Sequence, residues 1–327
     1  MRKFMKKTLP INTPLLSCYT KYGLLFSILD LENDPWAFNN FIQLVFVDEW
    51  HMFTFESQDY ILEDCPYLIC DKFSDSLIKP VYENDITSFI IDAINQNKYL
   101  LLWIDRYHLP VSSLYQKEHL PHELFVYGYD QNTREIYIAD NLNHGKFIFT
   151  TCNFNDINIG HFCLSDLYDM RRIMTIKINP QRPLASSSIN VKQIKRSLQF
   201  YLESWNFLFV DDKSKISGIK IFDHILVLAE KYQEYDRRFF HLLYEHSLFM
   251  EKRVFYLAQN NLLNSRKFDL AAFTHLKNNA LIMRNLVLKY QLTRNISLFQ
   301  KIEHLLLDFK AMQIRLFTDL IFMIDNC

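Results

Sequence analysis

The clearest alternation of apolar and polar positions lies in residues 122–141, where two runs rich in β-branched and aromatic residues flank a polar turn at 130–133. This pattern predicts a β-hairpin. Side chains alternate across a strand, so the even-numbered positions of both runs share one face. A three-residue loop centred on Gln131 would set His122 directly opposite Asp140, with their Cβ atoms about 5 Å apart.

Other patterns in the first half predict helices and strands in mixed order. Helical spacing predicts a helix over 83–96, and the continuous apolar run that follows predicts a buried strand over 98–107. Further segments are a helix-to-strand transition within 32–60, a short helix over 164–172, and strands over 146–152 and 173–179.

The second half shows helical periodicity and no strand pattern from Val191 onward. Five helices are expected, over 191–209, 219–234, 236–258, 268–292 and 295–325. A Pro- and Ser-rich linker at 179–188 separates the halves. We therefore expect an α+β protein with one domain at 1–180 and a helical bundle domain at 190–327.

Composition and charge disfavour nucleic-acid binding, membrane spanning and a cysteine-based metal site. The formal net charge of -1 offers no large basic surface for nucleic acid, and no run is long enough to span a membrane. The six cysteines show no metal-ligand spacing, so we expect no metal site and a reduced, cytoplasmic protein. The basic start and the sequence Leu-Leu-Ser-Cys at 15–18 offer secretion as an alternative, which the polar and proline residues of 8–14 disfavour.

Cys18 is the candidate nucleophile. It follows a loop that contains Pro14 and precedes apolar residues at helical spacing, so it is expected at a helix start, where the dipole favours a thiolate. The side chain of Asn12 and the backbone N–H of Cys18 are candidate oxyanion donors.

His122 is the candidate base, and Asp140 is the carboxylate that would orient its imidazole. Asn141 is a rival for the orienting role. His119 is a rival base, ranked lower because no acid follows it at strand spacing.

Cys18, His122 and Asp140 occur in the order found in papain-like cysteine peptidases. More narrowly, residues 12–180 resemble the N-terminal domain of the butirosin-biosynthesis H family. The residues that carry this resemblance are Cys18, the segment Trp103-Ile104-Asp105-Arg106-Tyr107-His108-Leu109-Pro110, and the segments from His122 to Asp130 and Ala139-Asp140. The second motif in that family reads Val-Asp-x-Tyr-Tyr-Leu-Pro. This chain keeps Asp105 and Tyr107 but has Arg106 and His108.

The resemblance implies a papain-like domain that transfers an acyl group from a carrier-protein thioester to an amine. The chain also resembles closthioamide-type amide synthases. The partners implied are an acyl or peptidyl carrier protein, which brings the phosphopantetheine, and an amine; no cofactor of the enzyme's own is expected. Asp105 and Tyr107 become substrate-binding candidates, although Asp105 in a turn-bracing role is the preferred interpretation.

The residues alone leave the reaction open. A cysteine peptidase or amidase would use the same triad with water as the second nucleophile. A binding module with an inert cysteine is the other alternative, since most single cysteines are small buried apolar residues.

Overall fold

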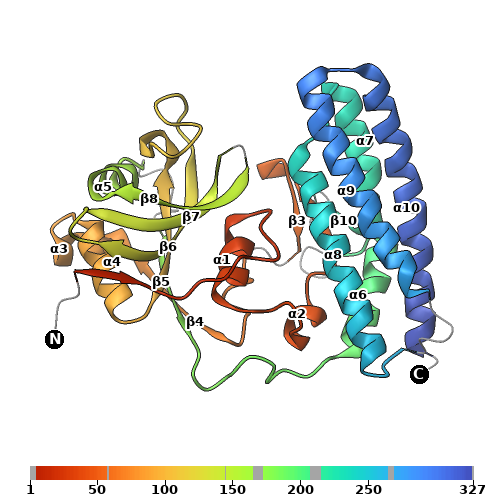
Figure 1. The fold of residues 1–327 in the computed structure, drawn as a ribbon, viewed down its shortest axis with the longest axis horizontal. Coiled ribbons are helices and arrows are strands. Elements are labelled where there is room, and N and C mark those ends of the chain that lie inside the picture. Colours follow the sequence, from red (N-terminus) through yellow and green to blue (C-terminus); the bar gives the residue numbers. More distant parts are fainter. Residues whose placement is uncertain are drawn as a thin grey trace. The chain divides into compact units, whose positions relative to one another are not determined.

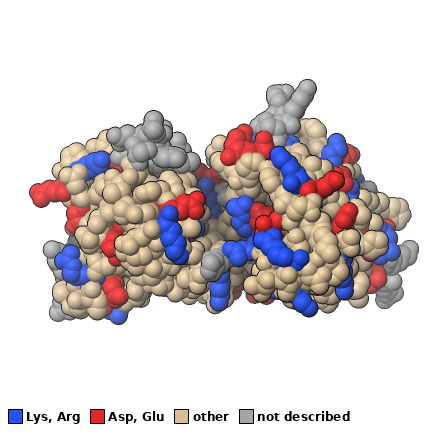
Figure 2. All heavy atoms as spheres, turned by 90° about the horizontal axis from the view of Figure 1, so that it is seen from above, with Lys and Arg blue, Asp and Glu red and all other residues tan. Residues whose placement is uncertain are grey.

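The computed structural model describes residues 5–56, 59–143, 145–164, 172–206, 215–263 and 269–325. It confirms the α+β class, with an antiparallel sheet in the first half and long helices in the second (Figure 1). The chain divides into two compact units, Met1–Asp30 with Asp59–Leu184 and Leu31–Gln58 with Ala185–Cys327. On the face drawn in Figure 2, acidic and basic side chains are interspersed, in agreement with the net charge of -1.

The first unit is built on a seven-stranded antiparallel sheet with the order β4-β9-β5-β6-β7-β8, and β1 pairs with β6. Its strands are β1 (Lys6–Thr8), β4 (Leu68–Ser74), β5 (Tyr99–Asp105), β6 (Pro121–Asp130), β7 (Glu135–Asn143), β8 (Lys146–Asn153) and β9 (Arg172–Ile178). The strands predicted near 98–107, 146–152 and 173–179 are confirmed as β5, β8 and β9. β1 and β4 were not predicted.

The helices of this unit are α1 (Thr20–Ile28), α3 (Asp75–Tyr82), α4 (Ile86–Asn95) and α5 (Phe154–Phe162). α4 confirms the helix predicted over 83–96, and the Asp85 side chain caps it by accepting a hydrogen bond from the Thr87 N–H. α3 and α5 were not predicted. The short helix expected over 164–172 falls mainly on 165–171, which lie outside the described residues.

The predicted hairpin forms, but its loop has four residues, 131–134, and not three. A β-bulge between Val126 and Gly128 then adds one residue to β6 and shifts the pairing. Beyond the bulge Val126 pairs with Ile138. Even-numbered positions therefore face each other as expected, but two residues away from the predicted register. Direct pairing of His122 with Asp140 was wrong: His122 lies opposite Ile104 of β5.

A close approach packs α1 onto β8. A Cβ atom at Gly23 would overlap the ring of Phe147, so any other residue at this point of the helix would have to displace that ring. This contact fixes the helix that follows Cys18 against the sheet.

The second unit contains the five predicted helices, observed as α6 (Val191–Glu203), α7 (Ile221–Tyr232), α8 (Arg237–Gln259), α9 (Leu270–Thr293) and α10 (Ile296–Asp325). Its remaining elements are α2 (Pro35–Asn39) and a small sheet of β10 (Ile216–Ser217), β2 (Leu44–Val47) and β3 (Met52–Phe55). None of the helices in the described ranges combines the length and hydropathy needed to cross a bilayer.

The expected domain at 1–180 differs from this division, because residues 31–58 pack with the helices of the second unit. β2 pairs with β10, a two-residue strand that helical periodicity could not reveal. The buried Arg253 of α8 also donates hydrogen bonds to the carbonyls of Phe38, Asn40 and Phe41. The helix-to-strand transition predicted for this segment is confirmed by α2 and β2.

Candidate active site

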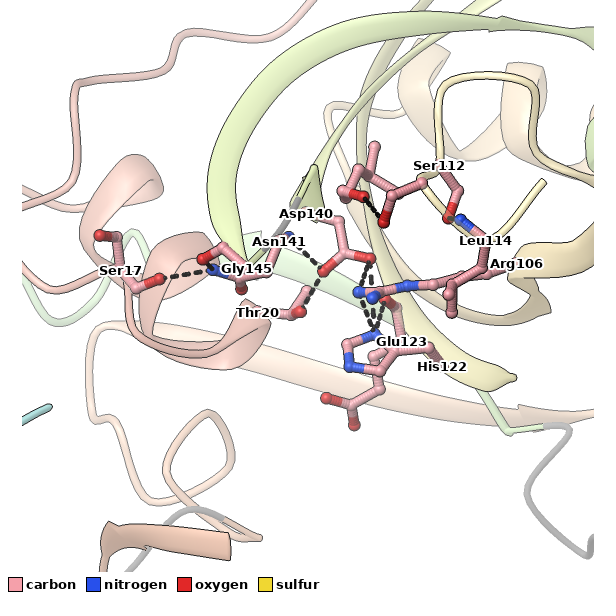
Figure 3. A network of polar contacts seen from close by, with 12 residues as sticks. Ser17, Thr20, Arg106, Ser112, Leu114, His122, Glu123, Asp140, Asn141 and Gly145 are labelled. Atoms are coloured by element: carbon pink, nitrogen blue, oxygen red, sulfur yellow. Dashed lines mark hydrogen bonds and ion pairs between the residues drawn. The ribbon is translucent and has the colours of Figure 1, made fainter. Parts of the chain in front are cut away.

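His122 and Asp140 lie close together at the edge of β6 and β7. Nδ1 of His122 is 3.4 Å from Oδ2 of Asp140, as Figure 3 shows. The Asp140 side chain is completely buried, whereas a third of the His122 side chain is exposed. The imidazole therefore has one nitrogen directed toward a buried carboxylate and part of its ring open to solvent.

Arg106 completes this group and was not recognised from the sequence. It lies in the 3₁₀ turn Arg106–His108 that directly follows β5. Its Nη2 is 2.5 Å from Oδ2 of Asp140 and 2.9 Å from Nδ1 of His122 (Figure 3). Arg106 stands at the unspecified position of the motif of the resembled family, so no signal in the sequence pointed to it.

The contacts of His122 Nδ1 restrict the tautomer in which the residue can act as a base. The same nitrogen lies 2.8 Å from the carbonyl of Glu123. A nitrogen that donates to that carbonyl cannot also accept from Arg106. Only the tautomer with the proton on Nδ1, facing Glu123 and Asp140, leaves the Nε2 lone pair free to take a proton.

Asp140 carries a negative charge in this surrounding. Burial alone would raise its pKa, but the charges of His122 and Arg106 and hydrogen bonds, including one from Thr20, outweigh that effect and lower the pKa to about 2. A permanently ionised carboxylate can hold an imidazolium that forms during a reaction.

Hydrogen bonds fix the segment around Cys18 beside this group. The Asn141 side-chain amide donates to the carbonyl of Ser17 at 2.9 Å, and the Thr20 hydroxyl donates to Oδ1 of Asp140. Cys18, which is 7% exposed, therefore lies between two residues that are bonded to the end of β7. The Asn141 amide is directed to Ser17 and holds the segment of Cys18, whereas the carboxylate of Asp140 is the group that lies beside His122.

A third contact joins the same segment to the strand of His122. Lys21 forms an ion pair with Glu123 at 3.2 Å, and both side chains are mostly buried. α1 begins at Thr20, so Cys18 stands two residues before the first helical residue, close to the predicted helix start. Tyr19 is the N-cap residue of α1, and its side chain makes no capping hydrogen bond.

Asn12 is not brought to this group. Its backbone N–H donates to the carbonyl of Ser27 near the far end of α1. Ser27 is seven residues beyond Thr20, which is about 10 Å along a helix. The Asn12 side chain is exposed there.

Asp105 braces the turn that carries Arg106. Its Oδ1 accepts from the N–H groups of Tyr107 at 3.0 Å and Leu120 at 3.1 Å, the bracing role preferred from the sequence. Its Oδ2 lies 2.6 Å from Nδ1 of His119. The sequence argument considered only an acid that follows His119, whereas this carboxylate precedes it in the chain. Tyr107 is half-buried, and its ring stacks on His119 with centroids 4.1 Å apart.

Residues 77–141 match the profile of a protein family described as butirosin biosynthesis protein H, N-terminal. This match confirms the resemblance over that segment. It includes Asp105, Arg106, His122 and Asp140, whereas Cys18 lies outside it. A search of curated proteins found no match to the chain.

Proposed function

We propose that this chain is a papain-like acyltransferase of natural-product biosynthesis, which moves an acyl or aminoacyl group from a carrier-protein thioester to an amine through an acyl-Cys18 intermediate. The family match supports the biosynthetic setting, because the matched profile is named for butirosin biosynthesis. The papain-like assignment rests on Cys18, His122 and Asp140 in that chain order, on a helix start and two antiparallel strands.

One observation carries this proposal. Contacts on both sides of Cys18 join its segment to the strands that hold His122 and Asp140. They are made by the backbone carbonyl of Ser17 and by the side chains of Thr20 and Lys21. Residues more than 100 positions apart in the sequence are thus assembled around one cysteine, which an inert buried thiol does not require.

The chemistry proceeds in two displacements. His122 takes the proton of the Cys18 thiol, the resulting thiolate attacks the thioester carbonyl, and the phosphopantetheine thiol leaves with that proton. The amine nitrogen then attacks the acyl-Cys18 carbonyl while His122 takes a proton from the amine, and Cys18 leaves as the thiolate, which restores the starting ion pair. Asp140 keeps the imidazole oriented in both steps. A thioester is converted to an amide, so no nucleotide is needed.

Backbone N–H groups are the oxyanion donors in this proposal. In this proposal the N–H of Cys18 and those of the first turn of α1 face the oxygen on which negative charge develops, next to the thiolate. Asn12 remains the donor expected from the sequence, but its position at the far end of α1 favours the backbone groups. An Asn12→Ala variant is expected to keep activity within a few-fold.

Tyr107 is the better of the two substrate-contact candidates. It is half-buried on the turn that carries Arg106, whereas both oxygens of Asp105 are engaged within the turn. We propose that Asp105 acts on the substrate only indirectly, by holding this turn.

The test is the product ratio when an acylated carrier protein is offered together with an amine and water. Transfer predicts that amide dominates for at least one amine, because an oriented reactant can reach an effective molarity of about 10⁵ M or more. Cys18→Ala should form neither product. Free acid for every amine, with cleavage of unblocked peptides, would establish the peptidase alternative. A wild-type thiol that resists iodoacetamide at neutral pH would establish the binding-module alternative.

A further inference from the structure

A second group of chemically active side chains lies at the end of β5 and is not used by the proposed reaction. One ligand atom from each of Asp105, His108 and His119 lies within 4.8 Å of the others. We propose that these three residues bind a divalent transition-metal ion of the Zn²⁺ class.

The local backbone explains why these residues meet. Asp105 precedes the 3₁₀ turn and His108 ends it. Such a turn has three residues per revolution, so positions three apart stand on the same side. The sequence shows no conspicuous spacing, because the third ligand is eleven residues further on.

Two hydrogen bonds donated by backbone N–H groups hold the segment around Leu120 next to Asp105 and Arg106. The Arg106 N–H donates to the carbonyl of Leu120 at 3.0 Å, and the Leu120 N–H donates to Oδ1 of Asp105 at 3.1 Å. They place His119 beside Asp105. The stacked ring of Tyr107 then holds the imidazole plane of His119. Two of the three ligands are thus positioned before any ion arrives.

The distances fit an ion after a small adjustment. Two ligands bound to one Zn²⁺ at about 2.1 Å can be at most about 4.2 Å apart. The ligand atoms here lie within 4.8 Å of one another, and His108 is only partly buried, so rotation of its side chain can close the difference. Asp105 is only 4% exposed and is the fixed ligand.

The donor set selects the kind of ion. Two imidazole nitrogens and one carboxylate suit Zn²⁺, Co²⁺, Ni²⁺ or Cu²⁺, whereas Mg²⁺ and Ca²⁺ prefer oxygen ligands alone. Three protein ligands leave at least one coordination position open.

The test is a titration of chelator-treated, full-length protein with Zn²⁺, followed by calorimetry, and with Co²⁺, followed by visible absorption. The protein should carry Cys18→Ala, because a thiolate beside an imidazole also binds these ions. One ion per chain is expected. Loss of an outer-shell partner typically weakens a metal site by about 10–100-fold, so losing a ligand in His108→Ala should weaken it by at least about tenfold.

Two variants make the result decisive. His108 has ring contacts with its neighbours but takes no part in the hydrogen bonds that brace the turn, so His108→Ala should leave the melting temperature of the metal-free protein unchanged. His275→Ala removes an exposed histidine of α9 and should leave affinity unchanged. Unchanged affinity in His108→Ala, or equal losses in His108→Ala and His275→Ala, would overturn the proposal. Both outcomes are independent of acyl transfer.

Discussion

Arg106 and Arg253 are both buried, but their guanidinium groups have different kinds of partner. Arg253 donates from Nε and Nη2 to the backbone carbonyls of Phe38, Asn40 and Phe41. Arg106 contacts a carboxylate and an imidazole. The first holds a segment of chain in place, and the second joins the charges of a candidate active site.

The pKa values show what each arrangement does. Burial lowers the pKa of Arg253 to about 9, since the dipoles of carbonyls replace only part of the water it has lost. Around Arg106 the charges outweigh burial, and the pKa of Asp140 falls to about 2. The guanidinium of Arg253 thus has a structural role. The guanidinium of Arg106 helps to set the protonation state of the titratable groups that it contacts.

The largest expected effect is that of Asp140→Asn on activity. An amide cannot stabilise the imidazolium and favours the wrong tautomer, so kcat should fall by about 10⁴-fold. Steady-state kinetics with an acylated carrier would measure it. The matched control is Asn141→Ala, which removes the hydrogen bond to Ser17 but leaves the carboxylate of Asp140 in place. Its kcat should fall far less than that of Asp140→Asn. Wild-type turnover in Asp140→Asn would remove Asp140 from the mechanism.

Arg253→Met should affect stability and not reactivity. Each buried polar group left without a partner costs about 1–3 kcal/mol, so losing the bonds to three carbonyls should lower the free energy of unfolding by about 3 kcal/mol or more. Urea denaturation would measure this. The alkylation rate of Cys18 in folded protein should stay unchanged, and a changed rate would show that the two arginines are not separable as described.

Arg106→Met should affect both the stability of the protein and the reactivity of Cys18. Removing one partner of a buried ion pair typically costs about 3–5 kcal/mol, and the loss here should be smaller because His122 and Thr20 still contact Asp140. The alkylation rate of Cys18 should also change, in contrast to Arg253→Met. Identical alkylation rates in the wild type and Arg106→Met would place Arg106 outside the site.

The smallest effect is a pH dependence of stability. The pKa of Asp140 is lower in the folded protein than its ordinary value of 3.8, so the stabilisation is present above that value and is lost as pH falls toward about 2. The loss should be about 2 kcal/mol. Unfolding curves between these pH values should show it in the wild type and not in Asp140→Asn. An equal slope in both would assign the effect to other carboxylates.

The contrast also shows what the sequence could reveal. The helices of the second unit were predicted closely, because periodicity over 12 to 30 residues is a strong signal. The hairpin was predicted, but its bulge was not, since one extra residue in β6 leaves no compositional mark. The packing of residues 31–58 on α8 includes the hydrogen bonds of Arg253, whose partners are carbonyls that every residue carries.

Within the candidate site, the proximity of His122 and Asp140 was expected from the sequence, the role of Cys18 stays a prediction, and the residues around them were not foreseen. Cys18, His122 and Asp140 stand out by residue type and order, whereas Thr20 and Arg106 act only through contacts that the tertiary structure creates. Asn12 was selected by its distance in sequence from Cys18, and its backbone hydrogen bond to Ser27 places it near the other end of α1.

The most direct test of the central claim is intact-protein mass spectrometry after mixing the protein with an acylated carrier alone, followed by peptide mapping. The account predicts one added acyl group, located on Cys18, which disappears when the acceptor amine is supplied. Cys18→Ala should gain no mass, and Asp140→Asn should gain it far more slowly. An acyl group on another cysteine, such as the exposed Cys163, or no acyl group with any carrier, would contradict the account.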